Sequence, residues 1–106
     1  MDTHKIATYL GFALKAGKVT LGINAARTLK KGVTCLLLDE GTASNSKKQV
    51  KKLRARLCCP LIEVENLGAL VCRQGCKLAA VRDLSLADAI LKEAEKQGIS
   101  VEGVIG

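Results

Sequence analysis

The spacing of apolar residues predicts alternating helices and strands along the chain. Near the N-terminus, apolar residues recur at helical spacing, Asp2 or Thr3 can cap the helix, and Gly17 can end it. A second helix of about nine residues is predicted between Gly22 and Gly32. The apolar positions that define the first helix are Ile6, Leu10, Ala13 and Leu14.

Short apolar runs bounded by turn residues predict the strands. The run 34–40, with sequence TCLLLDE, is typical of a buried strand. The other expected strands are residues 18–20, 61–64 and 77–81, with the tail 99–106 as a candidate edge strand.

Two further helices follow loop residues that can cap them. The residues before helix 47–57 are its candidate caps, namely Ser44, Asn45 and Ser46. The last helix starts at Ser85, with Asp88 at the spacing of a capping box, and Gly98 can end it. Residues 66–75 are predicted as a loop and a short helix. Strands that alternate with helices predict a single α/β domain over residues 1–106, with helices on both faces of a mostly buried sheet.

Composition and charge narrow the class of function. The chain has 106 residues and 48% hydrophobic content, enough for a core, and its net charge is +7. Such an excess of cations favours a polyanionic partner, nucleic acid first, although a solvated basic surface is the alternative. Tyr9 and Phe12 are the only aromatic residues, which argues against aromatic platforms that stack single-stranded bases.

The N-terminal sequence and the cysteines indicate a cytoplasmic protein. No stretch has the layout of a signal peptide or the length to span a bilayer, so no membrane partner is expected. Five cysteines, with Cys58 and Cys59 adjacent, do not form the pattern of a secreted disulfide framework.

Neither catalysis nor metal binding is expected. His4 is the only histidine, and no P-loop or GxGxxG motif occurs. The spacing of Cys58, Cys59, Cys72 and Cys76 differs from paired CxxC zinc ligands, and Cys35 lies in an apolar strand and is expected in the core. We therefore expect no enzyme, no metal and no cofactor.

The segment GINAARTLKKG, residues 22–32, carries the clearest candidate site. At 100° per residue, a helix here places Asn24, Arg27 and Lys31 on one stripe, opposite an apolar face. Gly22 leads the helix N-terminus, which favours phosphate, and Lys18 precedes it in sequence. In the next helix, six of the ten residues 47–56 are basic and spread around the non-core circumference. That spread fits plain solubility or phosphate contacts.

The order of motifs resembles the ribosomal protein L7Ae/L30e family, most closely its small bacterial branch. KAGKVTLG is similar to the family's segment that leads into the second helix. ARTLKKG is similar to the basic end of that helix. LLLDEGTASNSKK resembles the family's next strand, the loop after it and the start of the following helix. LGALVCRQGCKLAAVRD resembles the family's L-G segment and the strand that follows it. The likeness covers nearly the whole chain. It departs at Ala25, where the family has a glutamate, and at Cys72, where the family often has glycine.

The resemblance implies a three-layer α/β/α sandwich around a small mixed four-stranded sheet. It also implies a monomer that binds structured RNA without catalysis, typically a kink-turn, in association with the ribosome or another structured RNA. The alternative is a protein–protein interaction module of the same fold with only nonspecific RNA affinity. The residues that the resemblance and the helix pattern assign to RNA binding are Lys18, Gly22, Asn24, Arg27, Lys31, Leu67, Gly68 and Ala69.

If the second helix reads RNA, Arg27→Ala is expected to cost more affinity for a bent RNA with tandem G·A pairs than Lys52→Ala, because Arg27 lies in the motif and Lys52 in the diffusely charged helix. Titration of both variants against that RNA measures the difference. Equal losses would indicate a diffuse charge effect instead.

Overall fold

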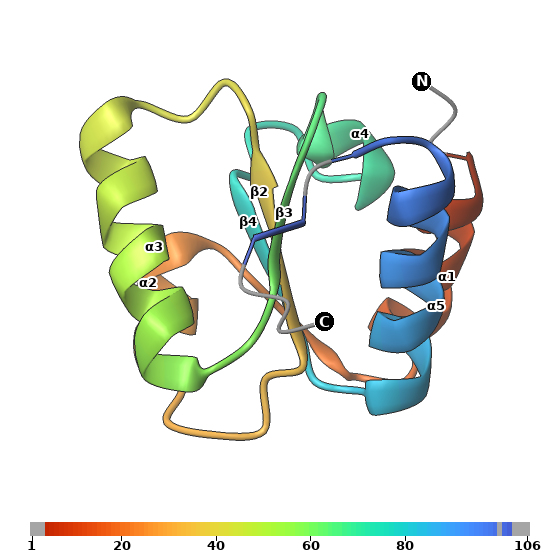
Figure 1. Ribbon diagram of the computed structural model, residues 1–106, viewed down its shortest axis with the longest axis horizontal. Coiled ribbons are helices and arrows are strands. Elements are labelled where there is room, and N and C mark those ends of the chain that lie inside the picture. Colours follow the sequence, from red (N-terminus) through yellow and green to blue (C-terminus); the bar gives the residue numbers. More distant parts are fainter. Residues whose placement is uncertain (1–3, 100, 103–106) are drawn as a thin grey trace.

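Helices and strands alternate along the chain in the computed structural model, which describes residues 4–99 and 101–102 (Figure 1). The elements are α1 His4–Lys15, β1 Val19–Leu21, α2 Ile23–Ala26, β2 Cys35–Asp39, α3 Ser44–Leu57, β3 Leu61–Val64, α4 Leu67–Leu70, β4 Leu78–Val81, α5 Leu84–Lys96 and β5 Val101–Glu102. The predicted alternation is confirmed. None of the helices in this described part is both long and apolar enough to cross a membrane.

The strands form one mixed sheet in the order β1-β4-β2-β3-β5. In residues 4–99 and 101–102, β2 and β3 form the one parallel pair, and Leu37 of β2 lies opposite Ile62 of β3 and Ala79 of β4. The sheet has five strands where the resemblance implies four, because the two-residue β5, which lies within the candidate edge strand 99–106, pairs with Leu61 and Ile62. Residue 100 and residues 103–106 of the candidate tail strand lie outside the described part.

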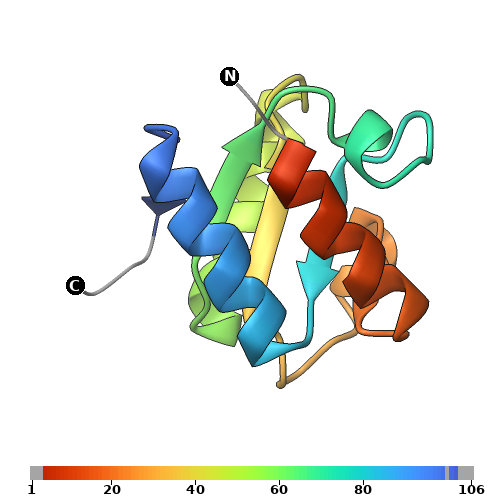
Figure 2. The ribbon, with the colours of Figure 1, turned by 90° about the vertical axis from the view of Figure 1, so that its right-hand side faces the viewer.

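Helices cover both faces of the sheet (Figure 1). Figure 2 shows α1 and α5 side by side on one face, near α4, where they pack on Leu37 and its neighbours. On the other face, α2 and α3 pack against Leu36 and Leu38 through buried residues that include Val50 and Leu53. Alternate residues of β2 thus face opposite layers, which explains why the whole strand is apolar up to its last residue.

The helix starts differ from those predicted. Helix α3 begins at Ser44 and its N-cap is Ala43, which has no side-chain oxygen to accept a cap hydrogen bond. In α5 the cap is Asp83, whose carboxylate accepts a hydrogen bond from the Leu86 N–H at 3.0 Å, so Ser85 lies inside the helix. The candidate caps of α1, Asp2 and Thr3, lie outside the described residues.

Helix α2 is one turn long, not nine residues. The Thr28 hydroxyl donates to the Ala25 carbonyl at 2.7 Å, which competes with a continued helical ladder. The Arg56 guanidinium of α3 donates to the carbonyls of Arg27 and Leu29, each at 3.0 Å. These two acceptors are therefore satisfied from outside the helix, and the chain leaves it after Ala26.

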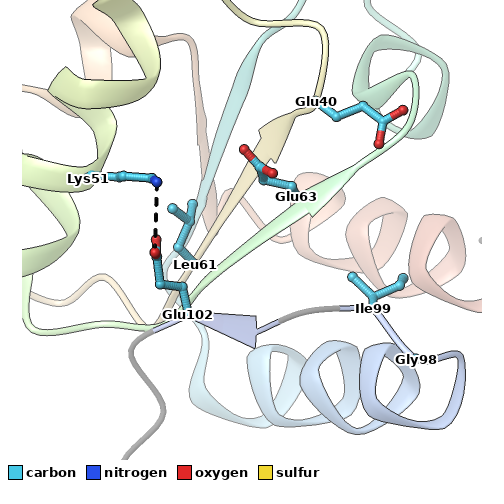
Figure 3. A pocket seen from close by; sticks show the side chains of 7 residues that line it. All are labelled: Glu40, Lys51, Leu61, Glu63, Gly98, Ile99 and Glu102. Atoms are coloured by element: carbon cyan, nitrogen blue, oxygen red, sulfur yellow. Dashed lines mark ion pairs between the residues drawn. The ribbon is translucent and has the colours of Figure 1, made fainter. Parts of the chain in front are cut away.

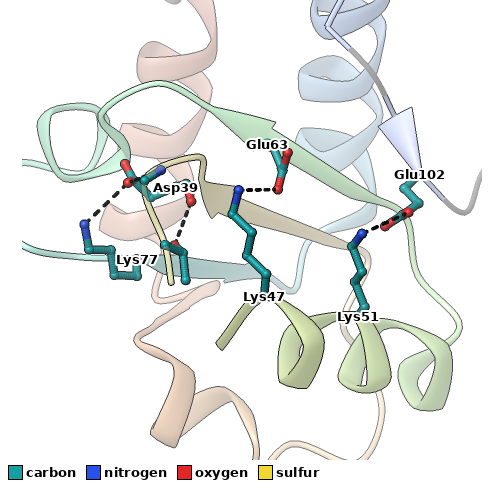
Figure 4. A network of polar contacts seen from close by, with 8 residues as sticks. Asp39, Lys47, Lys51, Glu63, Lys77 and Glu102 are labelled. Atoms are coloured by element: carbon teal, nitrogen blue, oxygen red, sulfur yellow. Dashed lines mark hydrogen bonds and ion pairs between the residues drawn. The ribbon is translucent and has the colours of Figure 1, made fainter. Parts of the chain in front are cut away.

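The Asp39 carboxylate joins the end of β2 to three other segments (Figure 4). It accepts hydrogen bonds from the backbone N–H of Leu67 at 2.8 Å and of Gly41 at 3.0 Å, and it pairs with the Lys77 ammonium at 3.5 Å. Only 7% of Asp39 is exposed. Burial by itself raises the pKa of Asp39, but the hydrogen bonds from Leu67 and Gly41 and the charge of Lys77 outweigh it and hold the pKa below its ordinary value.

We expect Asp39→Asn to lower the free energy of unfolding at neutral pH by about 2 kcal/mol, because an amide cannot replace a carboxylate that accepts from two N–H groups and a cation. The lowered pKa means that the carboxylate's contribution is present above the unfolded-state pKa, about 3.9, and is lost as pH falls through the folded-state value. Urea unfolding at several pH values measures both effects.

The difference between wild type and Asp39→Asn should therefore shrink below about pH 4. Asp88→Asn is the matched control, because Asp88 is an exposed carboxylate whose one ion pair within the described part of the chain is with Lys92. An Asp39→Asn effect no larger than that of Asp88→Asn would contradict the assigned role.

Candidate functional site

A cleft of about 340 Å³ opens where α2 begins. Gly22, Ile23 and Asn24 line one side, from the end of β1 and the start of α2. The other walls come from the first turns of α3 and from the loop that leads into β4, through Ser46, Gln49, Gly75, Cys76 and Lys77. We call this the upper cleft.

Strand pairing brings these segments together. Because β1 runs antiparallel to β4, the end of β1 meets the start of β4, and the Gly22 N–H donates to the Leu78 carbonyl at 2.8 Å. Gly22 has φ +95° and Gly75 has φ +81°, conformations that disfavour any side chain. Two glycines with positive φ therefore line the upper cleft.

A second cleft of about 370 Å³ lies between α3 and Arg27, the residue that follows α2. Its lining residues are Arg27, Gln49, Lys52, Leu53 and Arg56. Gln49 also lines the upper cleft, so the two adjoin there. We call this second cleft the lower groove.

The basic residues of α3 fall into two rows. Lys47 pairs with Glu63 at 3.4 Å and Lys51 with Glu102 at 3.9 Å, on the side of α3 that faces β3 and β5 (Figure 4). A pocket of about 310 Å³ on that side is lined by three glutamates and Lys51 among its seven residues (Figure 3). In the other row, Lys52 lines the lower groove, and no ion pair among the described residues joins it to a carboxylate. The even spread of charge predicted for this helix is therefore neutralised on one side only.

The structure brings together part of the predicted site. Gly22 and Asn24 line the upper cleft and Arg27 the lower groove. Lys18 precedes β1 at the opposite end of that strand, where its carbonyl accepts from the Arg82 N–H at 2.7 Å. Lys31 is exposed, in the irregular segment after α2. The predicted helical stripe through Lys31 is therefore wrong, because α2 ends at Ala26, and one turn of helix is too short for the argument that its dipole attracts phosphate.

None of the three residues predicted to close over RNA from α4 is among those that line the two clefts. Leu67 is fully buried in the core, so its side chain offers no surface to a ligand, which corrects its assignment. Gly68 is also buried, and a Cβ there would lie 2.7 Å from the Arg73 carbonyl oxygen. Ala69 is exposed but lines neither cleft. Leu67 and Gly68 therefore shape the loop, and its later residues, Gly75 to Lys77, reach the cleft.

Several lining residues were not assigned to the site from the sequence. They are Ile23, Ser46, Gln49, Lys52, Leu53, Arg56, Gly75, Cys76 and Lys77. In α3, Gln49, Lys52 and Arg56 follow i, i+3, i+7 spacing, which places them on one stripe. That stripe was a usable signal, but only the fold shows that it faces α2.

The described cysteines are free thiols, and no group of three His, Cys, Asp or Glu side chains in the described part could hold a metal ion. Cys35 is in the core, as predicted; burial, with a contribution from Cys59, raises its pKa to about 12. Burial is also the main reason why the pKa of Cys59 rises to about 11. Both thiols stay protonated at neutral pH and are poor nucleophiles. Cys58 and Cys72 are exposed.

No family model matches the chain, and no curated protein matches it. A solved structure described as a protein with unknown function from Bacillus halodurans C has a TM-score of 0.70 and 19% sequence identity. The match covers 84% of this chain and 95% of that one. It shows the fold alone. Any function must therefore be argued from the side chains of the clefts.

We expect Gly68→Ala to destabilise the protein by about 1–3 kcal/mol, because the added methyl group would overlap the Arg73 carbonyl, a backbone atom that cannot easily move. Chemical denaturation measures the change. Gly11→Ala is the matched control: a Cβ at Gly11 meets nothing within 4 Å, and alanine in helix α1 should stabilise by up to about 1 kcal/mol. Equal effects of the two substitutions would contradict the close approach at Gly68.

Proposed function

We propose that the protein binds structured RNA without catalysis, at the upper cleft, with preference for a kink-turn or a similar bent internal loop. The observation that carries this proposal is the meeting of Gly22 and Asn24 with the loop residue Lys77 around one cleft. Gly22 and Asn24 are the G-x-N positions of the L7Ae/L30e resemblance. Membership of that family, with its three-layer sandwich, is part of the proposal.

The side chains of the cleft suit recognition of a folded RNA. The exposed Asn24 amide can donate to and accept from a base edge, and Gln49 offers a second amide across the cleft. Lys77, whose side chain is 48% exposed although it pairs with Asp39, supplies a cation for phosphate. No aromatic side chain lines the cleft, which fits recognition by shape and backbone more than by stacking.

The missing glutamate limits what the site can do. Ala25 stands where the family has a carboxylate that accepts from guanine edges, so Asn24 must supply the amide contacts to the bases without it. In a kinked RNA, unstacked bases still present their edges to the Asn24 amide. The phosphates on either side of the kink can contact Lys77 and Arg27. We therefore propose shape-selective binding by a cytoplasmic monomer, in association with the ribosome or another structured RNA.

Two RNAs of equal length test this proposal, one with a kink-turn and one with Watson–Crick pairs in place of the G·A pairs. At near-physiological salt we expect a preference for the kink-turn of tenfold or more, about 1.4 kcal/mol. Asn24→Ala should reduce that preference, because it removes a contact to base edges. Lys96→Ala, on the exposed surface of α5 and outside both clefts, is the control and should leave the preference unchanged.

Equal, weak and salt-sensitive binding of the two RNAs would refute kink-turn selectivity. Phosphate contacts predict a log–log salt slope of roughly 0.7 to 0.9 per contact. No RNA binding, together with a partner whose affinity hardly depends on salt, would instead favour a protein–protein interaction module.

A further inference from the structure

The lower groove concentrates positive charge that the protein does not neutralise. Arg27, Lys52 and Arg56 line one cleft of about 370 Å³, and among the described residues no ion pair joins any of the three to a carboxylate. Like charges that share a cleft repel one another, and the low-dielectric walls strengthen their field. The groove is therefore a place where an anionic ligand would relieve repulsion.

The contrast within α3 shows that this is not simply a charged helix. Lys51 pairs with Glu102, whereas the adjacent Lys52 lines the groove and has no acidic partner among the described residues. The acids that face α3, Glu63 and Glu102, come from β3 and β5, on the side away from α2 (Figures 3 and 4). The sheet edge thus neutralises one row and leaves the other available to a ligand.

Arg56 is held in place while keeping donors for a ligand. Its Nη2 donates to the carbonyls of Arg27 and Leu29, and no hydrogen bond of the described residues uses its other guanidinium nitrogens. A guanidinium fixed in this way loses little side-chain entropy when it binds, and its remaining N–H groups suit a phosphate oxygen. Leu53 gives the groove an apolar wall that does not compete for the ligand.

We propose that the lower groove holds the phosphate backbone of one strand of the RNA stem that continues from the bend in the upper cleft. This inference rests on the proposed function. The two clefts adjoin at Gln49, so an RNA seated against Asn24 can continue along α3 past Lys52 to Arg56. Lysine and arginine contact phosphates without reading sequence, so the groove lengthens the footprint and fixes the direction of the stem.

The experiment compares Lys52→Ala with Lys51→Ala, which remove the same charge from adjacent residues of one helix. Both are titrated over a range of salt against three RNAs that share one kink-turn: one with two long stems, and two with one stem or the other trimmed. For the long-stemmed RNA, we expect Lys52→Ala to weaken binding about fivefold and to lower the salt slope by roughly 0.7 to 0.9. Lys51→Ala should stay within about twofold of wild type.

Trimming one of the two stems should weaken the wild type and abolish the difference between the variants. Lys52→Arg should restore binding, and urea unfolding should show that both alanine variants are folded. Arg56→Ala is not used, because Arg56 also supports residues 27–29.

Equal losses for Lys52→Ala and Lys51→Ala would overturn the inference in favour of diffuse charge, and so would a Lys52→Ala loss that is the same on all three RNAs. Failure of the proposed function gives a different result. Wild type would then bind the kink-turn and the plain duplex equally, while Lys52→Ala still lost more affinity than Lys51→Ala on both. That outcome would keep the groove as a backbone site and refute selectivity for the bend.

Discussion

The Asp39 carboxylate is the contact on which the geometry of the upper cleft depends. It lies at the end of the central strand β2 and accepts from Leu67, the first residue of α4, and from the turn at Gly41. Its third partner, Lys77, lines the upper cleft. A buried carboxylate is costly unless its acceptors are filled, and here those acceptors fix the loop that forms one wall of the cleft. Core and site are thus joined through one side chain.

This dependence explains why two residues of the predicted site shape the wall of the cleft without lining the cleft themselves. Leu67 and Gly68 stand in the L-G motif that resembles an RNA-contacting loop, but Leu67 fills the core and Gly68 lies against the Arg73 carbonyl. On either side of Arg73, the backbone has left-handed residues at Cys72, φ +55°, and Gly75, φ +81°. The cysteine stands where the resembling family often has glycine, and its positive φ supplies the physical reason for a glycine there.

Local signals in the sequence identified the elements, and long-range contacts decided the details. Apolar runs and helical spacing predicted β2, β3, β4 and the long helices, because the side chains that an element buries recur at the period of that element. The end of α2 was missed because Arg56, far along the chain, takes the carbonyls that a longer helix would use. Likewise, no pattern within 47–56 shows that Glu63 and Glu102 neutralise one side of α3, since those acids belong to other strands.

The division of charge on α3 bears on function more than the total charge does. A net charge of +7 attracts any polyanion and gives no orientation. Ion pairs with Glu63 of β3 and Glu102 of β5 weaken the positive potential on the side of α3 that faces the sheet edge. The positive potential that attracts a polyanion is therefore stronger on the other side of α3, at the lower groove. The solved structure with 19% sequence identity shows the fold but not where a ligand binds, because one fold serves many functions. The cations of the lower groove, which pair with no carboxylate among the described residues, support the proposed site, since the groove adjoins the upper cleft at Gln49 and would give the proposed RNA one path across the surface.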